Sequence, residues 1–172
     1  MKKSLKNLTT TLTLIPIVLA CFVFSQMTHA ESDVNPAPDG GYPGFTTAEG
    51  KNALKNLTSG VGNSGFGWYS LFSVTTDSYN TGLGAGTLAL NTAPANTASG
   101  VAALILNTTG TRNSANGAGA MVWNSAGTDN TGVGYFTLYN NDTGNSNSAL
   151  GSDTLLSNTS GDCNVAIGER SS

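Results

Sequence analysis

The chain has 172 residues, of which 22 are glycine and only 10% are charged, and its formal net charge is −3. An acidic chain with so few basic residues lacks the positive footprint of a nucleic-acid-binding protein. It would also be repelled by anionic lipid surfaces. Nucleic acid is therefore excluded as an expected partner.

Residues 1–30 have the layout of a secretory signal peptide. Three lysines within the first six residues precede an apolar run over 12–24, and small residues around Ala30 offer a cleavage site before Glu31. A membrane-anchoring helix is the alternative, but the run is shorter than the ~20 residues that a span needs. A lipid anchor at Cys21 is a second alternative. We expect export to the outside of the cell and no membrane span after cleavage.

Cleavage after Ala30 leaves four basic and ten acidic residues, a net charge of −6. The only histidine, His29, is lost with the signal peptide, and His-based catalysis and metal binding are lost with it. The acidic residues form no recurrent pair, and Cys163 is the sole remaining thiol. We predict a non-catalytic protein with no cofactor and no metal, and we name no catalytic or binding residue.

Residues 31–45 are rich in proline and glycine and read as a linker, and the remainder, 46–172, is one repeat domain. Its period is marked by glycines 17 residues apart, except for one interval of 16: Gly50, Gly67, Gly84, Gly100, Gly117, Gly134, Gly151 and Gly168. Repeat units begin at Thr46, Asn63, Asn80, Asn96, Asn113, Asn130, Asn147 and Asn164, and the last is incomplete.

The positions of the unit follow a fixed grammar. Position one is Asn in all units but the first, position two is Thr or Ser in all but the last, position three is Ala or Gly, position five is always Gly, and position eight is small. Position nine carries Leu or Met: Leu54, Leu71, Leu88, Leu104, Met121, Leu138 and Leu155. Asn-Thr or a near variant occupies positions twelve and thirteen in most units, often with Gly at position fifteen.

A short fixed period means that one unit is stacked on copies of itself. No helical stripe persists for two turns, so we predict an all-β parallel solenoid of seven to eight 17-residue turns. Strands are expected near positions two to five and seven to ten of each unit. The position-nine Leu should supply the core, Asn side chains should form ladders between turns, and Asn-Thr-x-Gly should turn through positive φ.

Several units carry more aromatic residues than a narrow interior can hold. Trp68, Tyr69, Trp123, Tyr135 and Tyr139 would form either a carbohydrate-facing surface or a protein-facing one. Burial against copies of the same chain would use them, so we expect a homo-oligomer.

The unit resembles the head repeats of YadA-like trimeric autotransporter adhesins. The resemblance lies in Asn96–Gly100, Ala103-Leu104 and Asn107–Gly110, and again in Asn147–Gly151 and Asn164–Gly168. The 17-residue period is similar to longer-period repeats of bacterial surface and tail-fibre-like proteins that often end in an endosialidase-type chaperone domain. The resemblance implies a left-handed β-roll, a homotrimer and adhesion. The family's heads usually start from 14-residue units, and no heptad stalk follows the repeats within these 172 residues.

These observations predict an exported structural or adhesive surface protein that mediates attachment or self-assembly. The alternative is an ice-binding or carbohydrate-binding solenoid. Ice binding would use a rank of threonines at position thirteen, spaced ~4.8 Å apart, although Asp142 interrupts that rank. Its members are Thr58, Thr75, Thr92, Thr108 and Thr159.

Overall fold

A computed structural model describes residues 44–172. These residues comprise the repeat domain and the last two residues of the predicted linker. The predicted signal peptide, the alternative lipid anchor at Cys21 and the rest of the linker lie outside the described residues.

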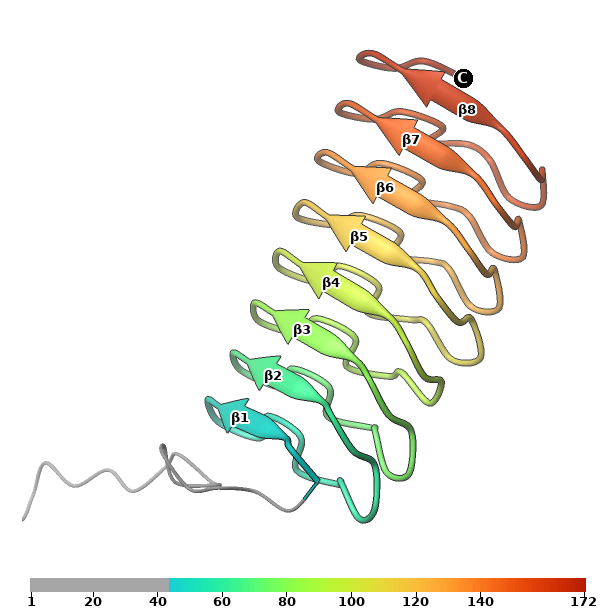
Figure 1. Ribbon diagram of the computed structural model, residues 1–172. Helices are drawn as coiled ribbons and strands as arrows, with labels where there is room; N and C mark the ends of the chain where they lie inside the picture. Colours follow the sequence, from blue (N-terminus) through green and yellow to red (C-terminus); the bar gives the residue numbers. More distant parts are fainter. Residues whose placement is uncertain (1–43) are drawn as a thin grey trace, which may run out of the picture. The chain divides into compact units, whose positions relative to one another are not determined.

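Eight three-residue strands form one parallel sheet in which each strand pairs with the next along the chain (Figure 1). They are β1 (Thr47–Glu49), β2 (Ser64–Phe66), β3 (Thr81–Leu83), β4 (Thr97–Ser99), β5 (Ser114–Asn116), β6 (Thr131–Val133), β7 (Ser148–Leu150) and β8 (Val165–Ile167). Since every turn of the chain adds one strand to the same sheet, the domain is a β-solenoid, and the predicted fold class is confirmed.

The strand register reproduces the sequence period. Thr47 pairs with Ser64, 17 residues on, whereas Thr81 of β3 pairs with Thr97 of β4, 16 residues on. The missing residue falls in the bend between these strands. There the side-chain amide of Asn91 donates to the carbonyl of Ala93, two residues on, whereas in the next turn Asn107 donates to Gly110, three residues on. The short unit therefore tightens one bend and leaves the sheet in register.

The second predicted strand, at positions seven to ten, is wrong. Residues at positions seven and nine have left-handed backbone conformations, as in Tyr69 (φ 56°) and Leu71 (φ 53°), so the chain zigzags there and forms no regular strand. Successive turns still bond to one another along this side, since the Leu71 N–H donates to the carbonyl of Thr87 at 3.0 Å. This side of the solenoid therefore has hydrogen bonds between successive turns, as a parallel sheet does, although its backbone dihedral angles are not those of a β-strand.

The interior is a single stack of apolar side chains. Leu71, Leu88, Leu104, Met121 and Leu138 are fully buried at position nine, which confirms their predicted role. The residue at position three of each repeat unit is the middle residue of its strand. It is Ala or Gly, and it points inward against these side chains. Position eight closes the interior opposite with Ala, Ser or Thr, because nothing larger fits beside the leucine.

Two buried asparagine ladders run through the domain, as predicted. At position one, the backbone N–H of Asn130 donates to Oδ1 of Asn113 at 3.1 Å, and the N–H of Asn113 donates to Asn96 at 3.0 Å. At position twelve, the side-chain amide of Asn124 donates to Oδ1 of Asn107 at 2.8 Å. In residues 44–172, no buried side-chain N or O atom is left without a hydrogen bond.

The chain does bend at the Asn-Thr-x-Gly segment, as predicted, but the residues with positive φ are not the ones expected. The left-handed residue lies at position seventeen, as in Asp129 (φ 59°), and the position-twelve asparagines serve the ladder instead. Position five also has positive φ, and Gly117 (φ 143°) shows why only glycine occurs there. A Cβ on Gly117 would overlap the carbonyl oxygen of Gly134 in the next turn.

Candidate functional site

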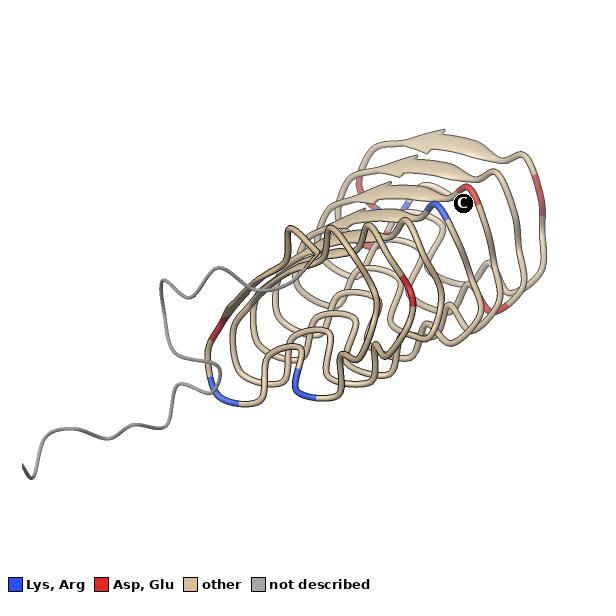
Figure 2. Ribbon diagram, turned by 60° about the horizontal axis from the view of Figure 1, so that its bottom comes forward, with Lys and Arg blue, Asp and Glu red and all other residues tan. Residues whose placement is uncertain are grey.

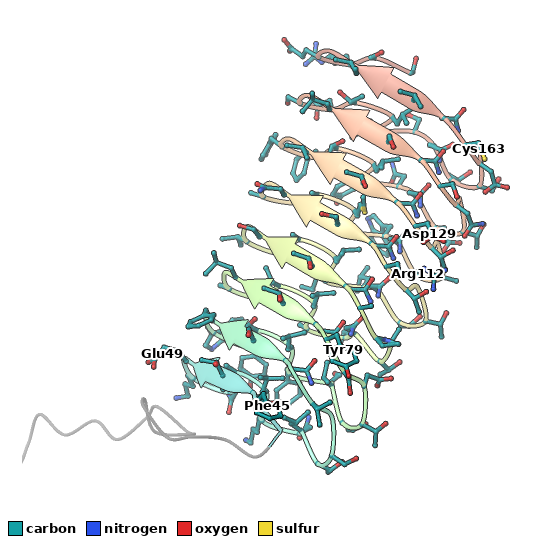
Figure 3. All side chains as sticks on the ribbon, in the orientation of Figure 1. Phe45, Glu49, Tyr79, Arg112, Asp129 and Cys163 are labelled. Carbon is teal, nitrogen blue, oxygen red and sulfur yellow. The ribbon has the colours of Figure 1, made fainter. Side chains whose placement is uncertain are left out.

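The exterior of the solenoid has three surfaces. The sheet face consists of positions two and four of β1–β8. The aromatic edge consists of positions six, seven and ten of each turn, and the Asn-Thr edge of positions thirteen to seventeen. Figure 3 shows Glu49, the last residue of β1, at the opposite margin from Tyr79, Arg112, Asp129 and Cys163 of the Asn-Thr edge.

On the sheet face, side chains alternate because successive residues of a strand point to opposite sides. Position three is buried in every strand, and positions two and four face outward. Position two is Ser or Thr from β1 to β7, in register along the sheet. Position four adds five exposed apolar side chains, which are Phe66, Leu83, Val133, Leu150 and Ile167. From β2 to β8 this face carries no charge.

The Ser/Thr rule at position two is visible in the sequence, but the neighbours that these side chains have on the outer face of the sheet are not. The signal lies in the alternation of each strand, where a small residue at position three separates the Ser or Thr from the larger residue at position four. In the structure position three points inward, so positions two and four of that alternation meet solvent.

The aromatic edge follows directly after the position-five glycine. Its backbone is stacked turn on turn, because the N–H of each position-seven residue donates to the position-six carbonyl of the preceding turn, as Phe136 does to Ala118 at 3.2 Å. Side chains at positions six, seven and ten therefore form columns along the domain. Four of the five aromatics singled out from the sequence lie here, and Trp123 is half exposed nearby at position eleven.

Two aromatic triads occupy this edge. In the second turn, the centroid of the Tyr69 ring lies 4.3 Å from that of Trp68 and 4.7 Å from that of Phe72. In the sixth turn, Phe136 lies 4.0 Å from Tyr135 and 4.9 Å from Tyr139. In each triad the position-seven ring is the central one, and the position-six ring, Trp68 or Tyr135, is more than half exposed. Stacking holds the exposed rings in place before any partner arrives.

Charged residues are sparse, as Figure 2 shows along the whole domain. On the aromatic edge they occur only at the two ends. The first turn contributes Lys51 and Lys55, and the seventh and eighth contribute Asp153, Glu169 and Arg170. Arg170 Nε lies 3.7 Å from the Asp153 carboxylate. The five turns between these ends place only aromatic side chains, aliphatic side chains or glycine at the three positions.

The Asn-Thr edge is held by hydrogen bonds between turns. In the rank considered for ice binding, the hydroxyls of Thr58, Thr92 and Thr108 each donate to a backbone carbonyl of the next turn. Asp142 interrupts this rank and accepts a hydrogen bond from the Ser125 hydroxyl. These hydroxyls serve the fold, so the rank is less available to an external lattice than the sequence suggested.

At position seventeen of the same edge, Arg112 and Asp129 of adjacent turns form a two-pronged ion pair. Nε of Arg112 donates to Oδ1 of Asp129 at 2.7 Å, and an η nitrogen donates to Oδ2 at 2.9 Å. This hydrogen bonding lowers the pKa of Asp129 below its ordinary value and raises that of Arg112. Cys163 occupies the same position two turns on, as an exposed free thiol.

Within residues 44–172, no three His, Cys, Asp or Glu side chains are grouped so that they could hold a metal ion. The same residues contain no helix long and apolar enough to cross a membrane. The described exterior has two broad surfaces with few charges, the sheet face and the aromatic edge.

Comparisons of the chain with protein-family models, with curated proteins and with solved structures find no match in any of the three. The family resemblance thus rests on the repeat motif, and the β-solenoid of about seven turns with 17-residue spacing is compatible with it.

Proposed function

We propose that the protein is an exported structural and adhesive repeat protein of the cell surface, and that it acts without catalysis, as a homotrimer. The observation that supports this most is the sheet face. From β2 to β8 it is an uncharged surface of Ser, Thr and exposed apolar side chains. A surface of this kind is suited to permanent contact with protein.

In the proposed trimer, the sheet faces of three parallel copies surround a common axis. Small Ser and Thr side chains at position two allow close approach, and the position-four apolar side chains, such as Leu83 and Leu150, become buried. Every buried polar side-chain atom of the repeat domain already has a partner, so recognition falls to the outer surfaces. The aromatic edges then remain on the outside of the assembly.

Light scattering after size exclusion tests the trimer through the absolute mass of the purified protein. We expect three times the chain mass. Leu83→Asp and Leu150→Asp together should lower it to one chain mass, because buried charge without a partner is costly. The matched pair Thr109→Asp and Ala126→Asp, exposed on the Asn-Thr edge, should leave it unchanged. A wild-type monomer would refute the trimer.

Export is tested separately, by expressing the full chain in a bacterium and determining the N-terminus of the protein found outside the cytoplasm. We expect Glu31 as the first residue. Retention in the cytoplasm with an intact N-terminus would refute export.

Ice binding is the second candidate, and the exposed Ser/Thr rank of β1–β7 favours it more than the position-thirteen rank does. Ice binding is tested by measuring thermal hysteresis, the gap between the melting and freezing points of a solution of the purified protein. A freezing-point gap that disappears in the Thr81→Leu, Thr97→Leu variant would establish ice binding at this face, and a gap of zero would exclude it.

A further inference from the structure

We propose that the aromatic edge is a self-recognition surface, which binds the aromatic edge of a second copy running in the opposite direction. The proposal deepens the proposed adhesive function by naming the partner, and it rests on that function for its biological setting. Four properties of the edge support it: the order of its side chains, the two-fold symmetry of that order, the charges at its ends and the packing of its aromatic rings.

Along the edge, the order of side chains is nearly the same from either end. The two aromatic triads lie in the second and sixth turns, and the fourth turn lies midway with Val101, Ala102 and Ile105. The third and fifth turns, on either side of the fourth, have smaller side chains than the turns with the triads. Glycine occupies position seven in both, at Gly86 and Gly119. Four turns at ~4.8 Å separate the triads by about 19 Å.

This order suits a two-fold contact. In a two-fold dimer the same patch is used by both copies, so residue i meets residue j and j meets i. With the axis at the fourth turn, the second turn of one copy faces the sixth turn of the other. Each aromatic triad then meets a triad, and Val101 meets its own equivalent.

The charges favour the antiparallel direction. In this arrangement the first turn, with Lys51 and Lys55, faces the seventh turn of the partner, with Asp153. The acidic end as a whole has two carboxylates, on Asp153 and Glu169, against one base, Arg170. A parallel contact would place lysines on lysines, and like charges facing each other across an interface are unfavourable.

The triad of the sixth turn shows how an exposed ring is supported. The Phe136 ring lies against the backbone of the preceding turn, since a Cβ on Gly119 would overlap its ring carbons. Phe136 also contacts the rings of Tyr139 and of the exposed Tyr135, so it supports the Tyr135 ring from behind. Rigid aromatic side chains lose little conformational entropy on binding and are the most frequent energetic centres of protein interfaces.

The size of the edge predicts a weak single contact. Six intervals between the first and seventh turns span about 29 Å, and a width of ~10 Å gives roughly 300 Å², compared with about 800 Å² per partner in a stable complex. Many copies on one surface would add their contacts through multivalency. Copies attached by the same end to two opposing surfaces meet antiparallel, so the geometry suits adhesion between surfaces.

The test uses the purified protein, attached through an N-terminal biotin to streptavidin beads at equal density, with a reductant present so that Cys163 forms no cross-links. Bead clustering is measured by light scattering. Wild-type beads should cluster. Trp68→Ser with Tyr135→Ser should reduce clustering about tenfold, because it removes the exposed ring of each triad. Tyr79→Ser removes a still more exposed aromatic ring from the Asn-Thr edge, and this control variant should cluster like the wild type.

Charge reversal tests the direction. Lys55→Glu beads and Asp153→Lys beads should each cluster less than the wild type, and mixing the two should restore clustering. A mixture of Lys55→Glu with wild-type beads should fall between the two pure samples. Clustering above the wild-type level in that mixture would indicate a parallel contact and overturn the proposal.

Wild-type beads that stay dispersed, or ring-deleted beads that cluster fully, would also overturn it. So would a glycan array on which the wild type binds oligosaccharides through Trp68 and Tyr135 while its beads stay dispersed, since the edge would then recognise sugar. Light scattering of the same variants keeps the two proposals apart. A trimer without clustering refutes only the self-recognition, and clustering by a monomer refutes only the trimer.

Discussion

Gly132 and Thr137 face each other across the interior of the sixth turn, where a Cβ added to Gly132 would lie 2.9 Å from Cγ2 of Thr137. The same compensation recurs along the domain. Turns with glycine at position three have Ser or Thr at position eight, and the first, fourth and fifth turns have alanine at both. The seventh and eighth turns depart from this rule, with Ala149 and Thr154 in the seventh and Ala166 and Ser171 in the eighth.

The first prediction follows from this pair. Gly132→Ala should lower the free energy of unfolding by about 1–3 kcal/mol, because the new methyl group overpacks the interior against Thr137 and Met121. Adding Thr137→Ala should recover part of the loss, since the fifth turn already packs Ala115 with Ala120. Denaturant unfolding of both single variants and the double variant measures the coupling. Additive effects would show that the two positions are independent.

Asn113 provides the second prediction. Its side chain is almost fully buried, accepts from both the backbone and side-chain N–H groups of Asn130, and donates to Gly127. Asn113→Ala should cost about 2–4 kcal/mol, because it leaves several buried polar groups without partners.

The matched control is Asn164→Ala, at the last rung of the same ladder. Asn164 is only partly buried and donates to Asn147, so its loss should cost about 1 kcal/mol or less. The midpoints of thermal unfolding rank the two variants, and equal shifts would contradict the role assigned to the ladder.

The third prediction compares two glycines at position five. Gly117→Ala introduces a methyl group that overlaps the Gly134 carbonyl oxygen at a φ of 143°, whereas Gly168→Ala has a φ of 117° with nothing within 4 Å. We expect a loss of more than about 3 kcal/mol for Gly117→Ala and about 1–2 kcal/mol for Gly168→Ala, where backbone strain acts alone. Denaturant unfolding measures both. A similar cost for both would mean that contact between turns is unimportant.

The fourth prediction concerns pH. The hydrogen bond from Arg112 lowers the pKa of Asp129 in the folded protein below its value in the unfolded chain. The pair therefore contributes stability above the unfolded pKa of about 3.9 and loses it as the pH falls through the lowered folded value. The effect should be small because both side chains are exposed. Asp129→Asn should flatten the pH dependence of the unfolding midpoint between about pH 2 and pH 5, and an unchanged profile would contradict the assignment.

Much of this fold was predictable because stacking repeats the same constraint in every turn. Gly117 and its equivalents must avoid the backbone of the next turn, Leu104 and its equivalents must fill one narrow stack, and Asn113 and its equivalents must bond to their neighbours. Each constraint acts between identical positions, so it appears in the sequence as a residue repeated at the period of the fold.

Most of the exterior could not be predicted in the same way, because outward-facing side chains other than the Ser or Thr of position two differ from turn to turn. Tyr69 and Leu71 give no sequence sign of their left-handed backbone, which replaces the expected second strand. The aromatic edge emerged only when the structure placed Trp68, Tyr69 and Phe72 in one stack, with a counterpart four turns away.

The sequence alone therefore determined the period, the core position, the asparagine ladders and the solenoid, since these arise from contacts between equivalent residues. The tertiary structure decided which residues of each turn face outward and which of them lie together. Those relationships depend on how the backbone bends within a turn, and apart from the Ser or Thr at position two, neighbouring turns impose no repeated residue type on the solvent side.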